Sequence, residues 1–189
     1  MKTFDLVGTP RSEYGKKANK ALRKEELVPC NLYGVGENLT FTVSEADVRK
    51  MIYTPDTLVI NLTVGDVKKV AVIKELQFHP VSEKLLHIDL LEVNDKKPVT
   101  VEIPVQLTGH AAGVKAGGKL SLEMRKLKVN GIYTNIPERV VVDVTELGLG
   151  KKIAVGDIQL ENLKLMNVKD ACVAQVRATR ASANAEAAE

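Results

Sequence analysis

Apolar and polar positions alternate through much of the first half of the chain after residue 38. Strands are predicted at residues 38–43, 57–64, 67–73 and 84–93, which alternate or are rich in β-branched residues. Gly65 and Asp66 predict a tight hairpin turn between the second and third of these strands. One helix interrupts the series, with Ser44 as its N-cap and Pro55 beyond its end. The pattern predicts a small α+β unit built around an antiparallel sheet or barrel.

The second half of the chain reads almost entirely as β-structure. Strands are predicted at residues 99–107, 120–129, 139–144, 153–160 and 171–177. Residues 109–118 contain four glycines and predict a loop, whose spacing matches no phosphate-binding fingerprint. The predicted fold class is mainly β with minor α: an N-terminal β-barrel-like α+β domain followed by an all-β C-terminal domain.

A charged polar run at residues 94–98, ending in Pro98, separates the two strand-rich halves. A length of 189 residues allows two small domains. The predicted division is 1–95 for the first domain and 96–178 for the second. Residues 179–189 are small and polar with two acids, and they predict a disordered tail.

Composition argues against a disordered chain, a disulfide-stabilised protein, a zinc protein and a membrane protein. The chain is 44% apolar and 27% charged, as folded soluble proteins are. Cys30 and Cys172 show no metal-ligand spacing and predict buried thiols in a reducing compartment. No secretory run or membrane-spanning stretch is seen, so a cytosolic location without membrane contact is expected.

Positive charge is concentrated in residues 11–24, where six basic residues against one acid give a net charge of +5, although the whole chain carries only +3. If residues 16–24 form a helix, Lys16, Lys20 and Arg23 or Lys24 fall on one side. Two interpretations remain open: a solvated, fraying basic arm, or an arm that contacts phosphates and orders on binding a nucleic acid.

A second group of polar residues follows from strand parity. His87 and Asp89 share one face of their strand, while Gln77 and His79 share one face of residues 74–79. If the two strands are neighbours, all four side chains form one polar surface. The surface fits an ordinary wet sheet face, a metal site or RNA recognition. A metal site is disfavoured because flat strands lack tetrahedral geometry, whereas imidazole, amide and carboxylate groups suit 2′-hydroxyls and base edges. No nucleophile or metalloprotease motif is present to support an enzyme.

An ordered series of short motifs carries a family resemblance. The motifs are Arg11, Gly15-Lys16, Leu22-Arg23-Lys24, Val28-Pro29, Leu32-Tyr33-Gly34, Lys74 to Pro80, His87 to Leu90, Pro104-Val105, Gly109, Gly113 to Gly118, Asn135 to Glu138, Val142 to Val144, Leu147 and Gly150. Over about residues 3–178 the chain resembles the bacterial large-subunit ribosomal protein family that binds 5S ribosomal RNA, in its long two-domain form, the general stress protein Ctc type.

The resemblance implies a structural protein whose N-terminal domain docks on 5S rRNA in the central protuberance. The RNA-contacting positions it implies are Arg11, Lys16, Lys20 and Arg23 toward phosphates, Asn19 and Tyr33 beside them, and Gln77, His87 and Asp89 on the sheet face. It implies no catalytic residue, metal, cofactor or small-molecule substrate. Expected partners are 5S rRNA, neighbouring large-subunit ribosomal proteins and 23S rRNA, on cytoplasmic ribosomes. The alternative is a stress-related adaptor whose C-terminal β-domain binds a protein partner on or near the ribosome.

The chain departs from the family pattern near the arm. Ala21 and Phe78 stand where arginine is frequent, and Glu26 stands where glycine is common. Fewer cations and an added acid should weaken phosphate binding or shift it onto Lys17 and Lys24.

Overall fold

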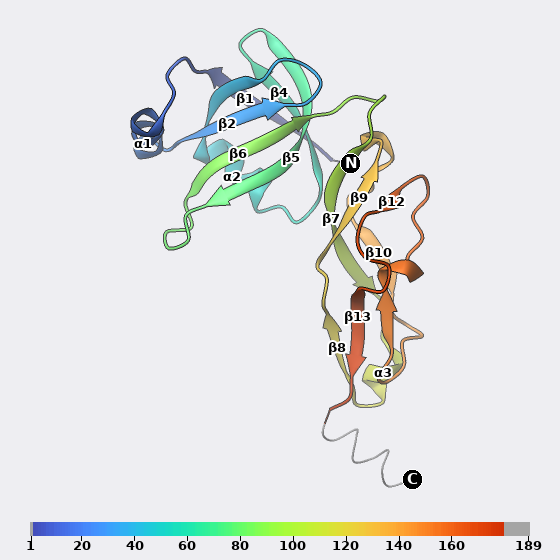
Figure 1. Ribbon diagram of the computed structural model, residues 1–189. Helices are drawn as coiled ribbons and strands as arrows, with labels where there is room; N and C mark the ends of the chain where they lie inside the picture. Colours follow the sequence, from blue (N-terminus) through green and yellow to red (C-terminus); the bar gives the residue numbers. More distant parts are fainter. Residues whose placement is uncertain (1, 180–189) are drawn as a thin grey trace. The chain divides into compact units, whose positions relative to one another are not determined.

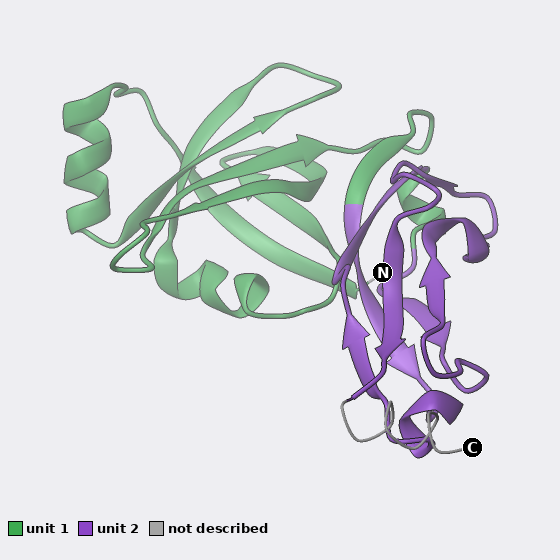
Figure 2. Ribbon diagram, turned by 60° about the horizontal axis from the view of Figure 1, so that its bottom comes forward, with its two compact units in different colours: residues 1–101, 132–136 green, residues 102–131, 137–189 purple. Residues whose placement is uncertain are grey.

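The computed structural model describes residues 2–179 (Figure 1). They form two compact units: residues 1–101 with 132–136, and residues 102–131 with those from 137 onward (Figure 2). Most of the disordered tail predicted at residues 179–189 lies outside the described residues, which end at position 179. Within this described part, no helix is long and apolar enough to cross a membrane.

A closed barrel forms the first unit. Its described strands are β1 (Lys2–Pro10), β2 (Leu27–Tyr33), β3 (Leu39–Ser44), β4 (Leu58–Val64), β5 (Val67–Phe78) and β6 (Leu85–Glu92), in the order β1-β3-β2-β6-β5-β4. Parallel pairing joins β1 to β4 and β2 to β6, whereas the other neighbours are antiparallel. Closure pairs both edges of the sheet, which an open sheet would leave exposed. The predicted N-terminal β-barrel-like α+β fold is confirmed.

Most of the predicted local elements of this unit are present. The helices are α1 (Lys16–Lys24) and α2 (Glu45–Ile52), and η1 (Tyr133–Asn135) is a short 3-10 turn. The hairpin turn is confirmed, because Val64 pairs with Val67 and Gly65 has a φ of 56°. The segment predicted at residues 67–73 continues as one strand to Phe78, with a register shift between Ile73 and Glu75.

The sequence pattern missed β1 and β2. β2 is buried at four of seven positions and does not alternate cleanly, and Pro29 argues against a central strand because it lacks an N–H donor. The structure tolerates Pro29 because the ladder to β6 begins only at the next residue, Cys30.

The barrel core is built around Phe41, which is fully buried together with Leu6, Ile60 and Ile88. Gly8 is required beside it, because a Cβ there would lie 2.4 Å from Phe41 Cδ2. Val48 and Met51 of α2 belong to the same buried cluster. This apolar packing holds the barrel strands in the register that positions their outward-facing side chains.

The second unit contains two small sheets. One has the order β10-β7-β9-β12, and the other has the order β11-β13-β8. Their strands are β7 (Val99–Thr108), β8 (Lys119–Leu122), β9 (Lys126–Gly131), β10 (Val140–Asp143), β11 (Lys152–Ala154), β12 (Lys164–Leu165) and β13 (Cys172–Arg177). The β-rich character predicted for this half is confirmed.

Three local predictions in the second half are wrong. Residues 120–129 form not one strand but β8 and β9, which belong to different sheets because the backbone N–H groups of Glu123 and Met124 turn to Val173 O. The strand predicted at 153–160 stops at Ala154, where the 3-10 turn η2 (Val155–Asp157) begins. The glycine-rich loop contains one helical turn, α3 (Ala112–Lys115).

A partly buried ion pair fixes the loop that follows β2. Lys69 Nζ lies 2.6 Å from Glu92 Oε1, and the Gly36 N–H donates to Glu92 Oε2 at 3.0 Å. The Glu92 side chain is only 12% exposed. The hydrogen bond from Lys69 is the main cause that lowers the pKa of Glu92 below its ordinary value.

We expect Glu92→Gln to lower the free energy of unfolding by about 1.5–3 kcal/mol at neutral pH, the range for hydrogen bonds to charged groups. Because the folded-state pKa of Glu92 is depressed, this contribution is complete above the unfolded pKa and is lost as the pH falls through the folded pKa. Urea unfolding at several pH values, followed by the amide NMR signals of β2 and β6, measures this difference in the free energy of unfolding. Glu37→Gln, an exposed carboxylate in the same loop, is the control. If Glu92→Gln lowered the free energy of unfolding by the same amount in acid as at neutral pH, the proposed dependence on the ionisation of Glu92 would be contradicted.

Candidate nucleic-acid interface

Helix α1 presents four lysines to solvent. Lys16, Lys17, Lys20 and Lys24 are exposed, and within the described part of the chain none of their ammonium groups makes a hydrogen bond or ion pair. Their spacing places them on one side of the helix. We call these four residues the lysine face. Residues 16–24 do form a helix, so the condition stated for a cationic side is met, and the cationic residues share one side as expected from the sequence.

The opposite side of α1 contacts the barrel. Its half-buried residues are Ala18, Asn19, Leu22 and Arg23. No residue of α1 is fully buried, so little apolar area holds the helix in place.

Arg11 holds the segment before α1 through hydrogen bonds inside the protein. Its Nε and Nη2 donate to Glu13 O at 3.1 and 2.9 Å, and Nη2 also donates to Asn19 Oδ1 at 2.7 Å. The guanidinium lies 5.3 Å from the centre of the Tyr14 ring. Two of the residues expected to contact RNA, Arg11 and Asn19, therefore contact each other.

Arg23, near the end of α1, contacts the barrel. Its Nε donates to Leu86 O on β6 at 3.0 Å, and its side chain is half-buried. The carbonyl comes from an irregular position: Gln77 pairs with His87 while the next residue, Phe78, pairs with Leu85. Leu86 is therefore an extra residue in β6, as in a β-bulge.

The two polar strands are neighbours, which is the condition for the shared polar surface expected from the sequence. Gln77 lies directly opposite His87, and Glu75 lies opposite Asp89. His87 Nδ1 is 3.5 Å from Asp89 Oδ1, with the two side chains 18% and 22% exposed. Gln77 Nε2 donates to Glu75 Oε1 at 3.4 Å. We call the group Glu75, Gln77, His87 and Asp89 the polar face.

His79 does not join the polar face, so this part of the prediction is wrong. β5 ends at Phe78, and His79 begins the turn toward β6. Its Nδ1 accepts hydrogen bonds from the backbone N–H groups of Val81 and Ser82, at 3.3 and 3.2 Å. The ring stabilises the turn instead of facing a ligand.

Sequence reasoning missed Asn31 as a neighbour of the polar face. Asn31 pairs with Asp89 across the parallel β2–β6 ladder, and Tyr33 pairs with Leu91 two residues further on. Both side chains are half-buried. Strand parity would have placed Asn31 and Tyr33 together had β2 been recognised as a strand.

The polar face carries negative charge. The pKa of Tyr33 is raised above its ordinary value, first by desolvation and then by the nearby carboxylates of Asp89 and Glu75. Burial raises the pKa of the Cys30 thiol, with Asp89 adding to the effect and Arg11 opposing it. The first unit therefore carries two surfaces of different charge: the lysine face of α1 and a polar face rich in hydrogen-bond acceptors.

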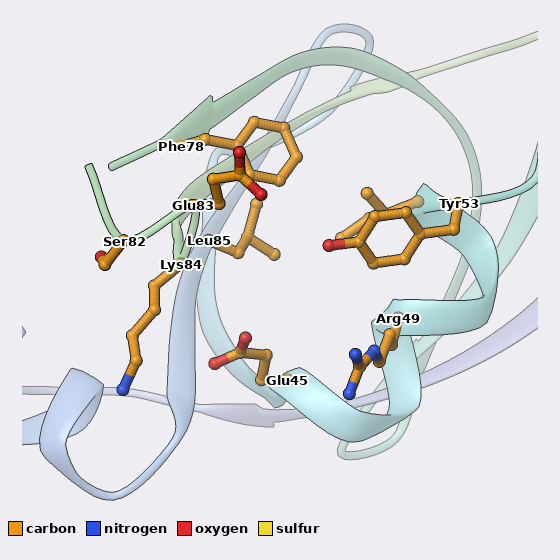
Figure 3. A pocket seen from close by; sticks show the side chains of 9 residues that line it. Glu45, Arg49, Tyr53, Phe78, Ser82, Glu83, Lys84 and Leu85 are labelled. Carbon is orange, nitrogen blue, oxygen red and sulfur yellow. The ribbon is translucent and has the colours of Figure 1, made fainter. Parts of the chain in front are cut away.

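A groove of about 230 Å³ lies between α2 and the β5–β6 turn. Figure 3 shows the rings of Tyr53 and Phe78 on opposite sides of its opening. Its charged residues are balanced, with Glu45 and Glu83 against Arg49 and Lys84, so the groove gives no net attraction for a polyanion. Phe78, the position where the family often has arginine, lines this groove.

Within residues 2–179, no group of three or more His, Cys, Asp or Glu side chains could hold a metal ion. Cys30 and Cys172 are both free. The lysine face and the polar face can offer a ligand charge attraction and hydrogen bonds.

Both halves of the chain match known protein families, and close relatives match over nearly its whole length. Residues 6–90 match the Ribosomal L25p family, and residues 98–180 match Ribosomal protein TL5, C-terminal domain. The chain is 56% identical over 187 residues to large ribosomal subunit protein bL25 of Porphyromonas gingivalis, covering 98% of this chain and 97% of that protein. It is 52% identical over 181 residues to the protein of the same name from Azobacteroides pseudotrichonymphae, covering 95% and 96%. Identity to the Bacteroides thetaiotaomicron protein of that name is 45% over 193 residues, covering 100% and 98%.

Proposed function

Because the chain belongs to the bL25 family of large ribosomal subunit proteins, we propose that it binds 5S rRNA in the central protuberance of that subunit. Family membership makes it a ribosomal protein of the cytoplasm. We assign it a structural role without catalysis. The observation that carries the RNA-binding proposal is the exposed lysine face of α1, which belongs to the same unit as the polar face of β5 and β6.

The lysine face supplies the attraction to phosphates. Four exposed ammonium groups on one side of a nine-residue helix can follow a phosphate backbone and release its condensed counterions. Lys17 and Lys24 are as exposed as Lys16 and Lys20. Their position supports the idea that they replace the cation missing at Ala21 and offset Glu26.

The polar face supplies discrimination. Glu75 and Asp89 repel phosphates, so the backbone of a bound RNA should lie over α1 and not over these strands. The carboxylates can accept hydrogen bonds from 2′-hydroxyls and from guanine amino groups in a shallow minor groove. Gln77 and His87 add donors and acceptors beside them, with Asn19 and Tyr33 as further polar contacts. Contacts of the lysine face with phosphates would thus position the RNA, and separate contacts of the polar face with base edges and 2′-hydroxyls would recognise it.

We assign RNA binding to the first domain, residues 1–95, because both surfaces belong to it. Residues 96–178 form the second domain in this proposal. The remaining proposed partners of the protein are neighbouring large-subunit ribosomal proteins and 23S rRNA.

Binding of the full-length protein to 5S rRNA should weaken steeply with salt. If four to six phosphates are neutralised, log K falls against log salt with a slope of about −3 to −5. Lys20→Ala should make the slope shallower by about 0.7–0.9, because one phosphate contact is lost. Lys50→Ala, which removes an exposed lysine of α2, should leave it unchanged. A wild-type slope near zero in a filter-binding titration would reject the phosphate mechanism.

Loss of a polar-face side chain should reduce affinity by a different route. His87→Ala and Asp89→Ala should each cost about 1–3 kcal/mol of binding to 5S rRNA, because edge groups of the RNA lose their partners. The salt slope should stay close to that of the wild type. Asp66→Ala, an exposed carboxylate in the β4–β5 turn, is the control. Wild-type affinity in both polar-face variants would remove these residues from the interface.

A further inference from the structure

We propose that Arg11 and Arg23 are positioning residues: they clasp the two ends of α1 to the barrel and leave the phosphate contacts to the lysine face. This inference rests on the proposed function, and it changes the role that the sequence predicts for both arginines. It follows from where each guanidinium donates its hydrogen bonds.

The clasp at the end of α1 is the bond from Arg23 Nε to Leu86 O, 3.0 Å long. A bulged residue lies outside the regular ladder, and Leu86 has no partner in either the β5 or the β2 register. The next residue of β6 is His87. One hydrogen bond therefore fixes the last turn of α1 relative to the strand that carries the polar face.

The clasp before α1 is centred on Arg11. Its backbone N–H donates to Thr40 O at 3.3 Å, which joins the segment to β3. Its side chain reaches forward to Glu13 O and to Asn19 Oδ1 inside the helix. Tyr14 covers the guanidinium, and its hydroxyl lies 3.1 Å from Arg11 O and 3.0 Å from Thr40 Oγ1.

Helix α1 needs such clasps because little else holds it. Its inner side offers only Ala18 and Leu22 as apolar contacts, both half-buried. Gly15 at the N-cap provides no side-chain oxygen, and the first turn has no acid. A helix of nine residues is marginal alone in water. Directed hydrogen bonds from the arginines therefore hold the lysine face in place, which lowers the entropy cost of binding RNA.

The hydrogen bonds inside the protein distinguish the role of the two arginines from that of the four lysines. Arg23 commits its Nε to Leu86 O, and Arg11 commits its Nε and Nη2 to Glu13 O and Asn19 Oδ1. These bonds fix where the remaining Nη donors of each guanidinium can point, whereas the four ammonium groups are uncommitted in the described part of the chain. The bond to Leu86 O comes from Arg23 Nε, and a lysine has a methylene group at that position of the side chain. Replacing Arg23 by lysine thus keeps the charge and removes the geometry.

The test compares Arg23→Lys, Arg23→Ala and Lys20→Ala in the full-length protein. Two readouts are used: salt titration of binding to 5S rRNA, and amide hydrogen exchange of α1 without RNA. Both Arg23 variants should bind about fivefold or more weakly at every salt concentration, the equivalent of one lost hydrogen bond, with the wild-type slope. Both should also exchange α1 amides faster. Lys20→Ala should make the slope shallower and leave the exchange of α1 unchanged.

Two results would overturn the clasp. One is wild-type affinity and exchange in Arg23→Lys. The other is a slope shallower by about one phosphate contact in Arg23→Ala with unchanged α1 exchange. Arg11→Lys repeats the test at the other end of the helix and should also accelerate α1 exchange. If the wild-type protein does not bind 5S rRNA, the proposed function fails, while the exchange measurement still decides whether the arginines hold α1.

Discussion

The parallel ladder between β2 and β6 is the contact on which the candidate interface depends. It runs from Cys30 and Ile88 to Tyr33 and Leu91. β2 follows α1 after only two residues, and β6 carries His87 and Asp89. Pairing these strands brings a basic helix and an acceptor-rich sheet face together across more than sixty positions of sequence. The apolar core around Phe41 holds the strands in that register.

The two surfaces differ in charge, and the difference gives each a separate task. Exposed lysines act at long range and do not distinguish sequences. Carboxylates and a histidine on a stiff sheet repel the backbone and accept only well-placed donors. A protein that carried only the first surface would bind any RNA, and one that carried only the second would attract none. In the proposed function, the two surfaces together select an RNA of matching shape.

The sequence predicted elements whose pattern is local. The β4–β5 hairpin and α2 follow from turn residues and periodicity, and strand parity correctly placed Gln77 and His87 on one surface, given that their strands pair. β2 was hidden by Pro29, because the register that tolerates it is a tertiary feature. The family resemblance drawn from scattered motifs is confirmed by relatives that match over nearly the whole chain.

Other features could not be predicted because they depend on where single strands end or slip. His79 fell outside the polar face because β5 stops one residue earlier and the ring caps the turn. Leu86 O is available to Arg23 only because β6 contains an extra residue. One competition measurement tests the proposed specificity for 5S rRNA most directly. Labelled 5S rRNA bound to the full-length protein is challenged with unlabelled 5S rRNA or with an unrelated structured RNA of equal length. The account predicts displacement by 5S rRNA at far lower concentration, and equal displacement by both would contradict it.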